Sequence, residues 1–406
     1  MPDDVLVVGA GPAGSMAALV LARAGVKVTL LDRVEFPRDK LCGDSINPGV
    51  LALLRRRALA ADVEARGVPI HGMLVTGPGN AAVTGRYADG VAGRSLRRRE
   101  LDAMLLDAAT GAGATFEANV RVTGASASDV NGSAAVNGVV VRTDGGTIVE
   151  RRAPIVIAAD GRRSSIAFGL GLARHPVRPR RWALGAYFEG VIGLAERGEM
   201  HIGKGRYIGV APLPGGLANA CVVVPELAAR SFMHAPDVAL EAAIVADARL
   251  RVRFERARRV TDVQVLGPLA VDVESAGIPG LVLAGDAAGF IDPMTGDGLR
   301  IAIKGAELAA EAALGYLQGR IGQPHLWLQG KRDTEFAGKL RTNRLLRSLV
   351  ARPLALSAAA VGARIVPAAV ERIIMYAGDV DAPVREDADE GRTVGRSFNS
   401  GDRGPS

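Results

Sequence analysis

The residues that most clearly carry chemistry lie near the start of the chain, in the segment Gly9-Ala10-Gly11-Pro12-Ala13-Gly14. An apolar, β-branched run at 5–8 precedes this segment and an Ala/Leu-rich stretch at 15–24 follows it, which predicts a buried strand and then a helix. In such a turn Gly9 permits the tight bend, Gly11 lets the backbone approach a pyrophosphate, and Gly14 lets helix and strand pack closely. The free N–H groups of the helix start face the phosphates, so the spacing predicts a dinucleotide site.

An acidic residue completes this unit. Asp32 follows the second predicted strand, Val26 to Leu31. At that position its carboxylate can accept hydrogen bonds from ribose hydroxyls. A glycine string alone is a weak signal, but the combination of strand, glycine turn, helix and acid is a strong one for a Rossmann-type site.

Two later segments repeat the arrangement of a buried strand followed by an aspartate. Asp160 follows a predicted strand at 153–159, and Asp286 follows a predicted strand at 281–284 and leads through Pro293 and Gly296 to Gly298. An aspartate at such a turn can hold a ribityl hydroxyl, and glycines at the next helix start expose N–H groups to negative charge on a reduced flavin. Each segment alone fits an ordinary strand-to-helix turn equally well. In this order, after the first motif, they favour a flavin.

Several stretches resemble a known family. Phe36 to Asp44 is similar to a PRxKxCG segment, Arg98 to Asp102 to an R-x-x-[FL]-D helix start, and Gly285 to Ala310 to a GDAAG…P-x-TGxGI…SGxxAA block. Together they resemble the FAD-binding signature of the p-hydroxybenzoate-hydroxylase-like flavoproteins, and most closely the geranylgeranyl reductase family. The likeness spans about 5–315. It is specific for superfamily and cofactor, and less so for substrate.

The resemblance implies a set of FAD contacts. Arg98 would reach the pyrophosphate region, Val122 would contact adenine through its backbone, and Leu299 would contact the isoalloxazine. Cys42 has three readings: a small residue near the flavin, a redox-active thiol, or a covalent flavin link; Cys221 is expected in the core. The expected cofactor-binding residues are Gly9, Gly11, Pro12, Ala13, Gly14, Asp32, Arg33, Arg38, Cys42, Gly43, Arg98, Val122, Asp160, Asp286, Gly296, Gly298 and Leu299.

The substrate motif departs from the family pattern. Where the family has Y-x-W-x-F-P, this chain reads Tyr207-Ile208-Gly209-Val210-Ala211-Pro212. Loss of the two large side chains predicts a wider or reshaped cavity, and the absence of W-x-W-x-I-P argues against flavin-dependent halogenases. Tyr207 would either orient a substrate or pack on its strand. Tyr207 and Pro293 are the candidates for a catalytic role beside the flavin.

Composition excludes several other classes. The 406 residues are 48% hydrophobic and carry a formal charge of +7, but aromatic residues make up only 4%, which is poor material for stacking nucleic-acid bases. Two cysteines are too few for a disulfide framework, and the five histidines show no metal or triad spacing. No second nucleotide fingerprint is present, so electrons would come from NAD(P)H or another external donor. With no targeting segment evident, the expected location is the cytoplasm.

The predicted fold is α/β: a Rossmann-type FAD-binding domain with an inserted antiparallel-sheet substrate domain and a C-terminal helical segment. The expected pieces are 1–70, 96–178 and 268–320 for the FAD-binding domain, 71–95 and 179–267 for the substrate domain, 321–377 for the helical segment, and 378–406 for a disordered tail.

Three functions compete. The leading one is reduction of a carbon–carbon double bond in an apolar small molecule, prenylated or not, by hydride from reduced FAD. The alternative is a monooxygenase that hydroxylates an aromatic or polyketide-like substrate through a flavin hydroperoxide. The third is a non-catalytic, membrane-associated flavin-binding protein, because Leu345 to Tyr376 carries Arg347, Arg352, Arg364 and Arg372 among apolar residues. A helical cap over the active site explains that segment equally well. The sequence leaves the oligomeric state open.

Overall fold

The computed structural model describes residues 3–130, 133–143, 146–178, 180–203, 205–226, 228 and 234–380. Its first layer is a six-stranded sheet in the order β21-β22-β12-β1-β2-β8, parallel except for β21. These strands are β1 (Val5–Val8), β2 (Val28–Leu31), β8 (Thr115–Glu117), β12 (Ile155–Ala158), β21 (Gly277–Ile278) and β22 (Leu281–Leu283). The inner strands β22, β12 and β1 are apolar throughout because both faces of the sheet are covered.

Alternate residues of these strands feed two cores. Val5 and Val7 pack with the helices of one face, whereas Leu6 and Val8 pack on the other. The first face carries α1 (Pro12–Arg23), α4 (Arg98–Gly111) and α9 (Gly298–Leu317). The second carries the sheet of β9 (Arg121–Val130), β10 (Ser133–Arg142) and β11 (Ile148–Arg152), together with α5 (Ser165–Gly169). This arrangement fixes the carboxyl ends of β1, β2, β12 and β22 at one edge.

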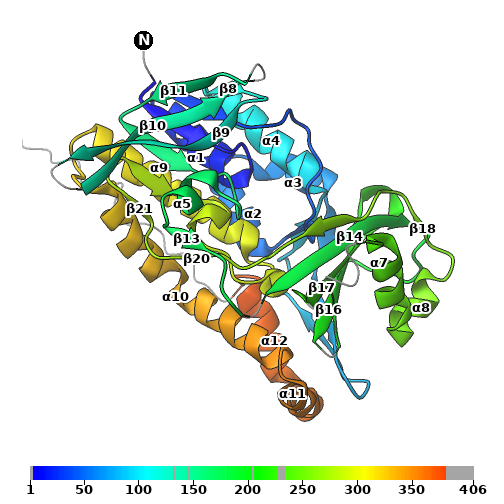
Figure 1. The fold of residues 1–406 in the computed structure, drawn as a ribbon. Helices are drawn as coiled ribbons and strands as arrows, with labels where there is room; N and C mark the ends of the chain where they lie inside the picture. Colours follow the sequence, from blue (N-terminus) through cyan, green and yellow to red (C-terminus); the bar gives the residue numbers. More distant parts are fainter. Residues whose placement is uncertain are drawn as a thin grey trace, which may run out of the picture.

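The second large layer is a mostly antiparallel eight-stranded sheet, which lies beside the first in Figure 1. It consists of β5 (Gly72–Thr76), β6 (Ala82–Arg86), β14 (Arg181–Glu189), β15 (Gly198–Gly203), β16 (Arg206–Leu213), β17 (Leu217–Pro225), β18 (Arg258–Arg259) and β19 (Gln264–Leu266). One face packs under α7 (Pro236–Val245) and α8 (Ala248–Phe254). The sequence from 238 to 254 has the composition of one continuous helix. The chain instead breaks at Asp247, whose side chain caps α8 by accepting from Leu250 N at 3.1 Å.

Short elements join the two layers. They are β3 (Ser45–Ile46), α2 (Pro48–Arg56), α3 (Ala60–Arg66), β4 (Val68–Ile70), β7 (Gly93–Ser95), β13 (Ala173–Arg174) and β20 (Asp272–Val273). β3, β7 and β4 form a small sheet of their own. The predicted fold class is confirmed: a Rossmann-type sheet, an antiparallel sheet and C-terminal helices. The exact domain boundaries stay a prediction.

The C-terminal segment consists of α10 (Pro324–Val350), α11 (Pro353–Ile365) and α12 (Pro367–Ala377). The breaks fall at the prolines because proline lacks the N–H that a helix interior needs. α10 runs along the first layer and leads to α11 and α12 below the second (Figure 1). The first residues of the expected tail at 378–406 contact the folded chain: Gly49 N donates to Gly378 O at 3.1 Å, and Asp379 pairs with Arg300. Residues 381–406 lie outside the described part of the chain.

Buried polar contacts attach α10 to the loop before α9. Lys339 Nζ lies 2.9 Å from Asp297 Oδ1 and 2.8 Å from Asp379 Oδ1. Asn343 Nδ2 donates to Asp292 O at 2.9 Å, and Arg332 donates to Ala288 O at 2.8 Å. All three side chains on α10 are buried. The helix therefore fixes the polypeptide that carries the third sequence motif.

We predict that Lys339→Met destabilises the protein by about 3–5 kcal/mol, because it leaves two buried carboxylates without their shared cation. The measurement is equilibrium unfolding in denaturant. Lys331→Met is the matched control, since Lys331 lies on the exposed side of the same helix. An unchanged unfolding midpoint for Lys339→Met would contradict the assigned role.

Candidate FAD site and adjoining cavity

The first glycine turn is dictated by backbone contacts. Gly9 has φ 96°, and a Cβ there would lie 2.5 Å from Ala159 O. A Cβ at Gly14 would lie 1.7 Å from the Gly9 carbonyl oxygen. At Gly11, by contrast, the nearest neighbour of such a Cβ is the Arg38 guanidinium at 3.4 Å. Gly9 and Gly14 are thus needed for the turn itself, whereas Gly11 faces open space beneath a cation, as a phosphate site requires.

Asp32 is held against this turn. Its carboxylate accepts from Ala10 N at 2.7 Å and from Val34 N at 3.2 Å, and the side chain is only 9% exposed. The remaining lone pairs are positioned to accept from a ribose. Pro12 and Ala13 are buried in the first turn of α1, and that turn has no side-chain cap. The N–H groups at this helix start are therefore available for phosphate oxygens.

The other two aspartates follow β12 and β22 at the same sheet edge. Asp160 accepts from Ser165 N at 2.8 Å through one oxygen, while its other carboxylate oxygen is buried without a partner among the described residues. Asp286 lies on the short helix η2 (Gly285–Ala288) and attracts Arg162. Burial lowers the pKa of Arg162 to about 10, and its Nε is buried without a partner among the described residues. Buried polar atoms without a protein partner are the kind of group that a bound cofactor would satisfy.

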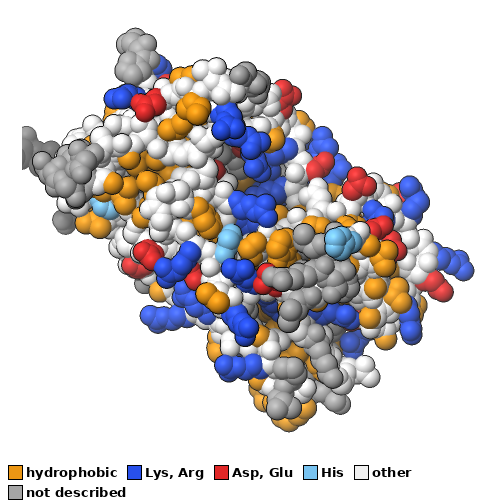
Figure 2. Space-filling model, in the orientation of Figure 1, with side chains coloured by type: hydrophobic (Ala, Val, Ile, Leu, Met, Phe, Trp, Pro, Cys, Tyr) orange, Lys and Arg blue, Asp and Glu red, His pale blue; other side chains and the backbone are white. Residues whose placement is uncertain are grey.

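The segment after Asp32 brings further cations to this edge. Arg38 Nη1 lies 3.4 Å from Asp102 Oδ2, and Arg98 Nε lies 2.7 Å from Asp102 Oδ1. Burial lowers the pKa of Arg98, but Asp102 and Cys42 raise it by more, so the guanidinium stays charged. Burial and the neighbouring Arg98 lower the pKa of Lys40, which forms no ion pair with a described residue. Figure 2 shows lysine and arginine side chains in a band across the middle of this face.

The residues present therefore fit FAD. Glycine turn, free helix N–H groups and cations suit a pyrophosphate, while Asp32 and the partly unpartnered Asp160 suit hydroxyls. Arg33, the exposed neighbour of Asp32, lies beside this group. Val122 lies on β9, where its carbonyl accepts from Ser165 Oγ at 3.0 Å, so this oxygen is already engaged. Sequence reasoning missed Lys40 and Arg162; the only signal was a basic residue beside each recognised motif.

The third motif forms the start of α9. Pro293 opens the one-turn helix η3 (Pro293–Thr295), Gly296 follows with φ 69°, and Gly298 and the buried Leu299 begin α9. This short loop follows Asp292, whose contacts hold it in place. The motif thus places backbone N–H groups at a helix start close to the sheet edge, as an isoalloxazine site requires.

Tyr207 does not open onto a cavity. Its side chain is only 3% exposed, and its hydroxyl donates to Asp292 Oδ1 at 2.5 Å. Arg181 lies 3.3 Å from the other Asp292 oxygen and 5.3 Å from the Tyr207 ring centre. Burial and Asp292 raise the pKa of Tyr207 well above its usual value. Of the two expectations for Tyr207, packing on its strand fits, and the packing positions the loop that begins at Asp292.

Cys42 and Gly43 lie where the FAD edge meets the second sheet. The Cys42 carbonyl accepts from Asn219 Nδ2 at 2.6 Å. The Cys42 thiol interacts with Arg98 and also with Cys221, and burial, then Cys42, raise the pKa of Cys221 to about 12. Both cysteines are free and partly buried. Cys221 is a neighbour of Cys42 that the sequence did not reveal, because Cys42 lies in the loop before β3 and Cys221 lies on β17, far apart along the chain.

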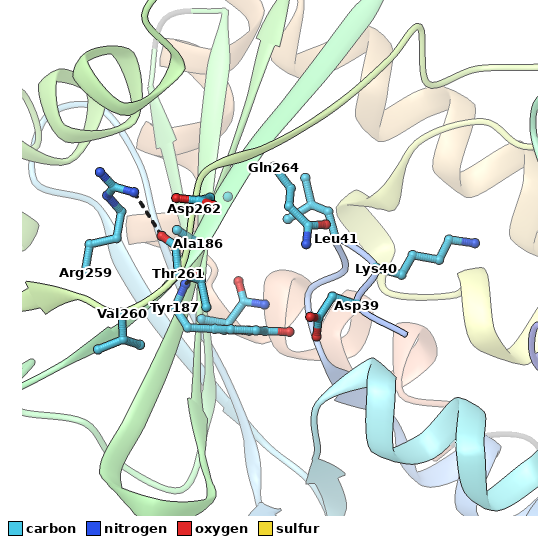
Figure 3. A pocket seen from close by; sticks show the side chains of 12 residues that line it. Asp39, Lys40, Leu41, Ala186, Tyr187, Arg259, Val260, Thr261, Asp262 and Gln264 are labelled. Carbon is cyan, nitrogen blue, oxygen red and sulfur yellow. Dashed lines mark hydrogen bonds between the residues drawn. The ribbon is translucent and has the colours of Figure 1, made fainter. Parts of the chain in front are cut away.

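A cavity of about 530 Å³ adjoins this segment. Its lining residues are Asp39, Lys40, Leu41, Gly185, Ala186, Tyr187, Asn219, Arg259, Val260, Thr261, Asp262 and Gln264. Figure 3 shows that segment 39–41 and loop 259–264 border the cavity from different sides, with Tyr187 between them. Because Lys40 belongs both to this wall and to the cationic edge, the cavity opens beside the expected flavin position.

Small residues lie on one face of the second sheet, and one of them, Gly185, lines the cavity. Gly185 and Gly209 both pair with Cys221 in register, and Ala211 pairs with Asn219, so their side-chain positions share one face. A Cβ on Gly209 would meet only backbone oxygens, at 3.9 Å. The two positions that lost Trp and Phe relative to the family pattern therefore lie on the face toward the FAD edge. Neither Gly209 nor Ala211 lines the cavity of about 530 Å³, so the expected reshaping stays a prediction.

Comparisons with known proteins agree with this site. A model of the FAD binding domain family matches residues 3–326. A menaquinone reductase of Mycolicibacterium smegmatis is 31% identical, over 76% of this chain and 75% of its own. A digeranylgeranylglycerophospholipid reductase of Methanosarcina mazei is also 31% identical, over 76% of this chain and 74% of its own.

Solved structures show the same fold. A geranylgeranyl bacteriochlorophyll reductase-like protein of Thermoplasma acidophilum superposes with a TM-score of 0.74 at 23% identity, covering 93% of this chain and 92% of the other. A flavin-dependent brominase superposes with a TM-score of 0.79 at 21% identity, covering 93% and 94%. At these identities the likeness speaks for the fold alone.

Fold and site together define an FAD-dependent flavoprotein oxidoreductase. The chain belongs to the FAD binding domain family, and its likeness to the geranylgeranyl reductases within that family is confirmed.

We predict that Asp32→Ala lowers FAD affinity at least tenfold, because the ribose loses its acceptor and Ala10 N loses the carboxylate that orients the turn. Quenching of flavin fluorescence on titration of the apoprotein measures this affinity. Asp107→Ala is the control, since Asp107 is exposed on α4. Equal affinities for the two variants would show that Asp32 does not contact the cofactor.

Proposed function

We propose that this protein reduces a carbon–carbon double bond of an apolar, prenylated small molecule. When bound, FAD supplies hydride chemistry. The observation that carries the proposal is the cavity of about 530 Å³ whose wall includes Lys40 and Leu41 of the FAD segment. A volume of this size suits a small organic molecule. The relatives named as menaquinone and digeranylgeranylglycerophospholipid reductases support the same class of reaction.

Cofactor binding and substrate binding are assigned to two different regions of the chain. The Gly9 turn, Arg38 and Arg98 would hold the pyrophosphate, and Asp32 the ribose. The loop at 292–298 would present backbone N–H groups to the isoalloxazine, with Tyr207 and α10 keeping that loop in place. Leu41 and Gly185 would border the substrate on its apolar side. We propose NAD(P)H, or another external donor, as the source of electrons, delivered without a second nucleotide-binding domain.

A monooxygenase would use nearly the same cofactor site. The two reactions differ in their need for oxygen, because hydroxylation requires it and double-bond reduction does not. We predict that the FAD-loaded protein, reduced and held without oxygen, converts a short prenyl substrate to its saturated product, detected by mass spectrometry as a gain of two hydrogens. The control omits the protein and keeps free reduced FAD. A product that forms only in air, with a gain of one oxygen, would favour the monooxygenase instead.

A peripheral contact with anionic membranes is a second proposal, and it rests on α11 and α12. Ile365 is 74% exposed and Val361 is 56% exposed, and Val366 and Ile373 are exposed nearby. Hydrophobic side chains are visible at this end of the molecule in Figure 2. Between 340 and 377 the sequence has six arginines and one acidic residue, Glu371; the side chain of Arg364 lies outside the described part. Apolar residues among cations suit an anionic lipid surface. No helix in the described residues is long and apolar enough to cross a membrane.

We predict that the protein co-sediments with vesicles that contain anionic lipid and that the double variant Val361→Asp/Ile365→Asp does so at least fivefold less. The double variant loses two apolar side chains that would insert into the lipid, and it gains two negative charges that anionic lipid repels. Val177→Asp is the control, because Val177 is exposed on another part of the chain. Equal sedimentation of the wild type and the double variant would show that α11 does not bind the membrane.

A further inference from the structure

A buried carboxyl group lies where the two large sheets meet. Asp44 is 0% exposed and has φ 53°, so its backbone turns sharply after the Cys42-Gly43 pair. One carboxylate oxygen accepts from Arg98 N at 2.9 Å, and the other accepts from Asn219 Nδ2 at 2.5 Å. Its carbonyl accepts from Ser95 Oγ and from Leu96 N. Asp44 is therefore fixed from α4 on the FAD side and from β17 on the substrate side.

The surroundings of Asp44 allow it to change its protonation state. Burial raises the pKa of the Asp44 carboxyl to about 6, although hydrogen bonds from Asn219 and Arg98 oppose that rise. The charged or titratable groups that face it are Arg98 on α4, Tyr187 on β14, Cys221 on β17 and Cys42 on its own segment. Arg98 is already engaged in a two-pronged pair with Asp102. Among the described residues, Asp44 thus has no salt-bridge partner that would hold it permanently ionised.

Tyr187 connects this carboxyl group to the cavity. The Tyr187 phenol and the Asp44 carboxyl group are close enough to shift each other's pKa, and the Tyr187 side chain lines the cavity. Asn219, which donates to Asp44, lines the same wall. In Figure 3 the Tyr187 side chain extends from β14 toward the segment that carries Asp39. Burial and the nearby Asp44 carboxylate raise the pKa of Tyr187 well above its usual value. The phenol therefore releases its proton only when another group replaces that proton.

We propose that Tyr187, with Asp44 behind it, donates the proton that accompanies hydride transfer to the substrate in the cavity. This inference rests on the proposed reductase function. Saturation of a double bond requires a hydride on one carbon and a proton on the other. The Tyr187 hydroxyl proton forms the new C–H bond, and the Asp44 carboxyl proton passes to the Tyr187 oxygen in the same step. Asp44 is left as the carboxylate and regains its proton from solvent after product release.

The order of donors follows from where charge is stabilised. A buried tyrosinate beside a carboxylate would be unfavourable, so Tyr187 cannot end the step with a negative charge. At Asp44 the charge is met by the Arg98 N–H and the Asn219 amide. Tyr187 is thus the catalytic residue, and Asp44 is the positioning residue that supplies its proton. A proton donor held in place in this way contributes about 10²–10⁴-fold to such a step.

The experiment measures anaerobic single-turnover reduction of a short prenyl substrate, in the FAD-loaded wild type and in Tyr187→Phe, across pH 5 to 9. We expect the wild-type rate to fall as pH rises above the Asp44 pKa of about 6, because the ionised carboxyl has no proton to give. Tyr187→Phe should be at least 100-fold slower at pH 5, with FAD affinity within twofold of wild type. Tyr87→Phe is the matched control, because Tyr87 is also half-buried but lies after β6 and does not line the cavity.

A second variant, Asp44→Asn, provides a readout that does not need turnover. The folded pKa of Asp44 lies above its ordinary 3.8, so protonated Asp44 contributes stability that is present below about pH 4 and is lost as pH rises through about 6. Asp44→Asn removes this titration. Its Tm should therefore rise relative to wild type between pH 4 and pH 7, and its reduction rate should be slow and independent of pH.

The outcomes separate the two proposals. If the wild type reduces the substrate and Tyr187→Phe does so at the same rate with the same pH profile, the proton-donor proposal is wrong and the reductase function stands. If Asp44→Asn leaves the pH dependence of Tm unchanged, Asp44 does not titrate as proposed. A wild type that reduces no prenyl substrate without oxygen overturns the reductase function and this proposal together.

Discussion

The segment from Phe36 to Asp44 is the constraint on which the rest of the site depends, because it is fixed to both large sheets. On the FAD side Arg38 pairs with Asp102 beneath the glycine turn. On the substrate side the Cys42 carbonyl and the Asp44 carboxylate both accept from Asn219 on β17. One short stretch of chain thereby forms the wall of the cofactor cleft and the wall of the cavity. Any displacement of this segment would separate the cofactor cleft from the cavity.

The opposite wall is fixed by contacts from distant parts of the chain. Tyr207 and Arg181 of the second sheet hold Asp292, and Asn343 and Lys339 of α10 hold the backbone and the cap of α9. These side chains are buried, so the loop is set by hydrogen bonds in a region of low dielectric, where each bond is strong and costly to break. The C-terminal helices therefore support the active site.

Local sequence patterns sufficed for the cofactor side of the fold. The Gly9 turn, Asp32 and the strand-to-helix turns at Asp160 and Asp286 are each contained in a few consecutive residues, and a parallel sheet brings such turns to one edge. The substrate side depends on pairings that no local pattern encodes. The approach of Cys221 to Cys42 and the contact of Asn219 with Asp44 come from the register of β17 against β14 and from its packing on a distant segment. The sequence left the role of Tyr207 open because its partner, Asp292, lies far along the chain.

The most direct test of this account is a structure of the protein with FAD bound. The account predicts the pyrophosphate at the Gly9 turn near Arg38, and the isoalloxazine between segment 39–44 and loop 292–298, with one edge open to the cavity that Tyr187 lines. An isoalloxazine placed away from that cavity, or a pyrophosphate away from the glycine turn, would contradict it.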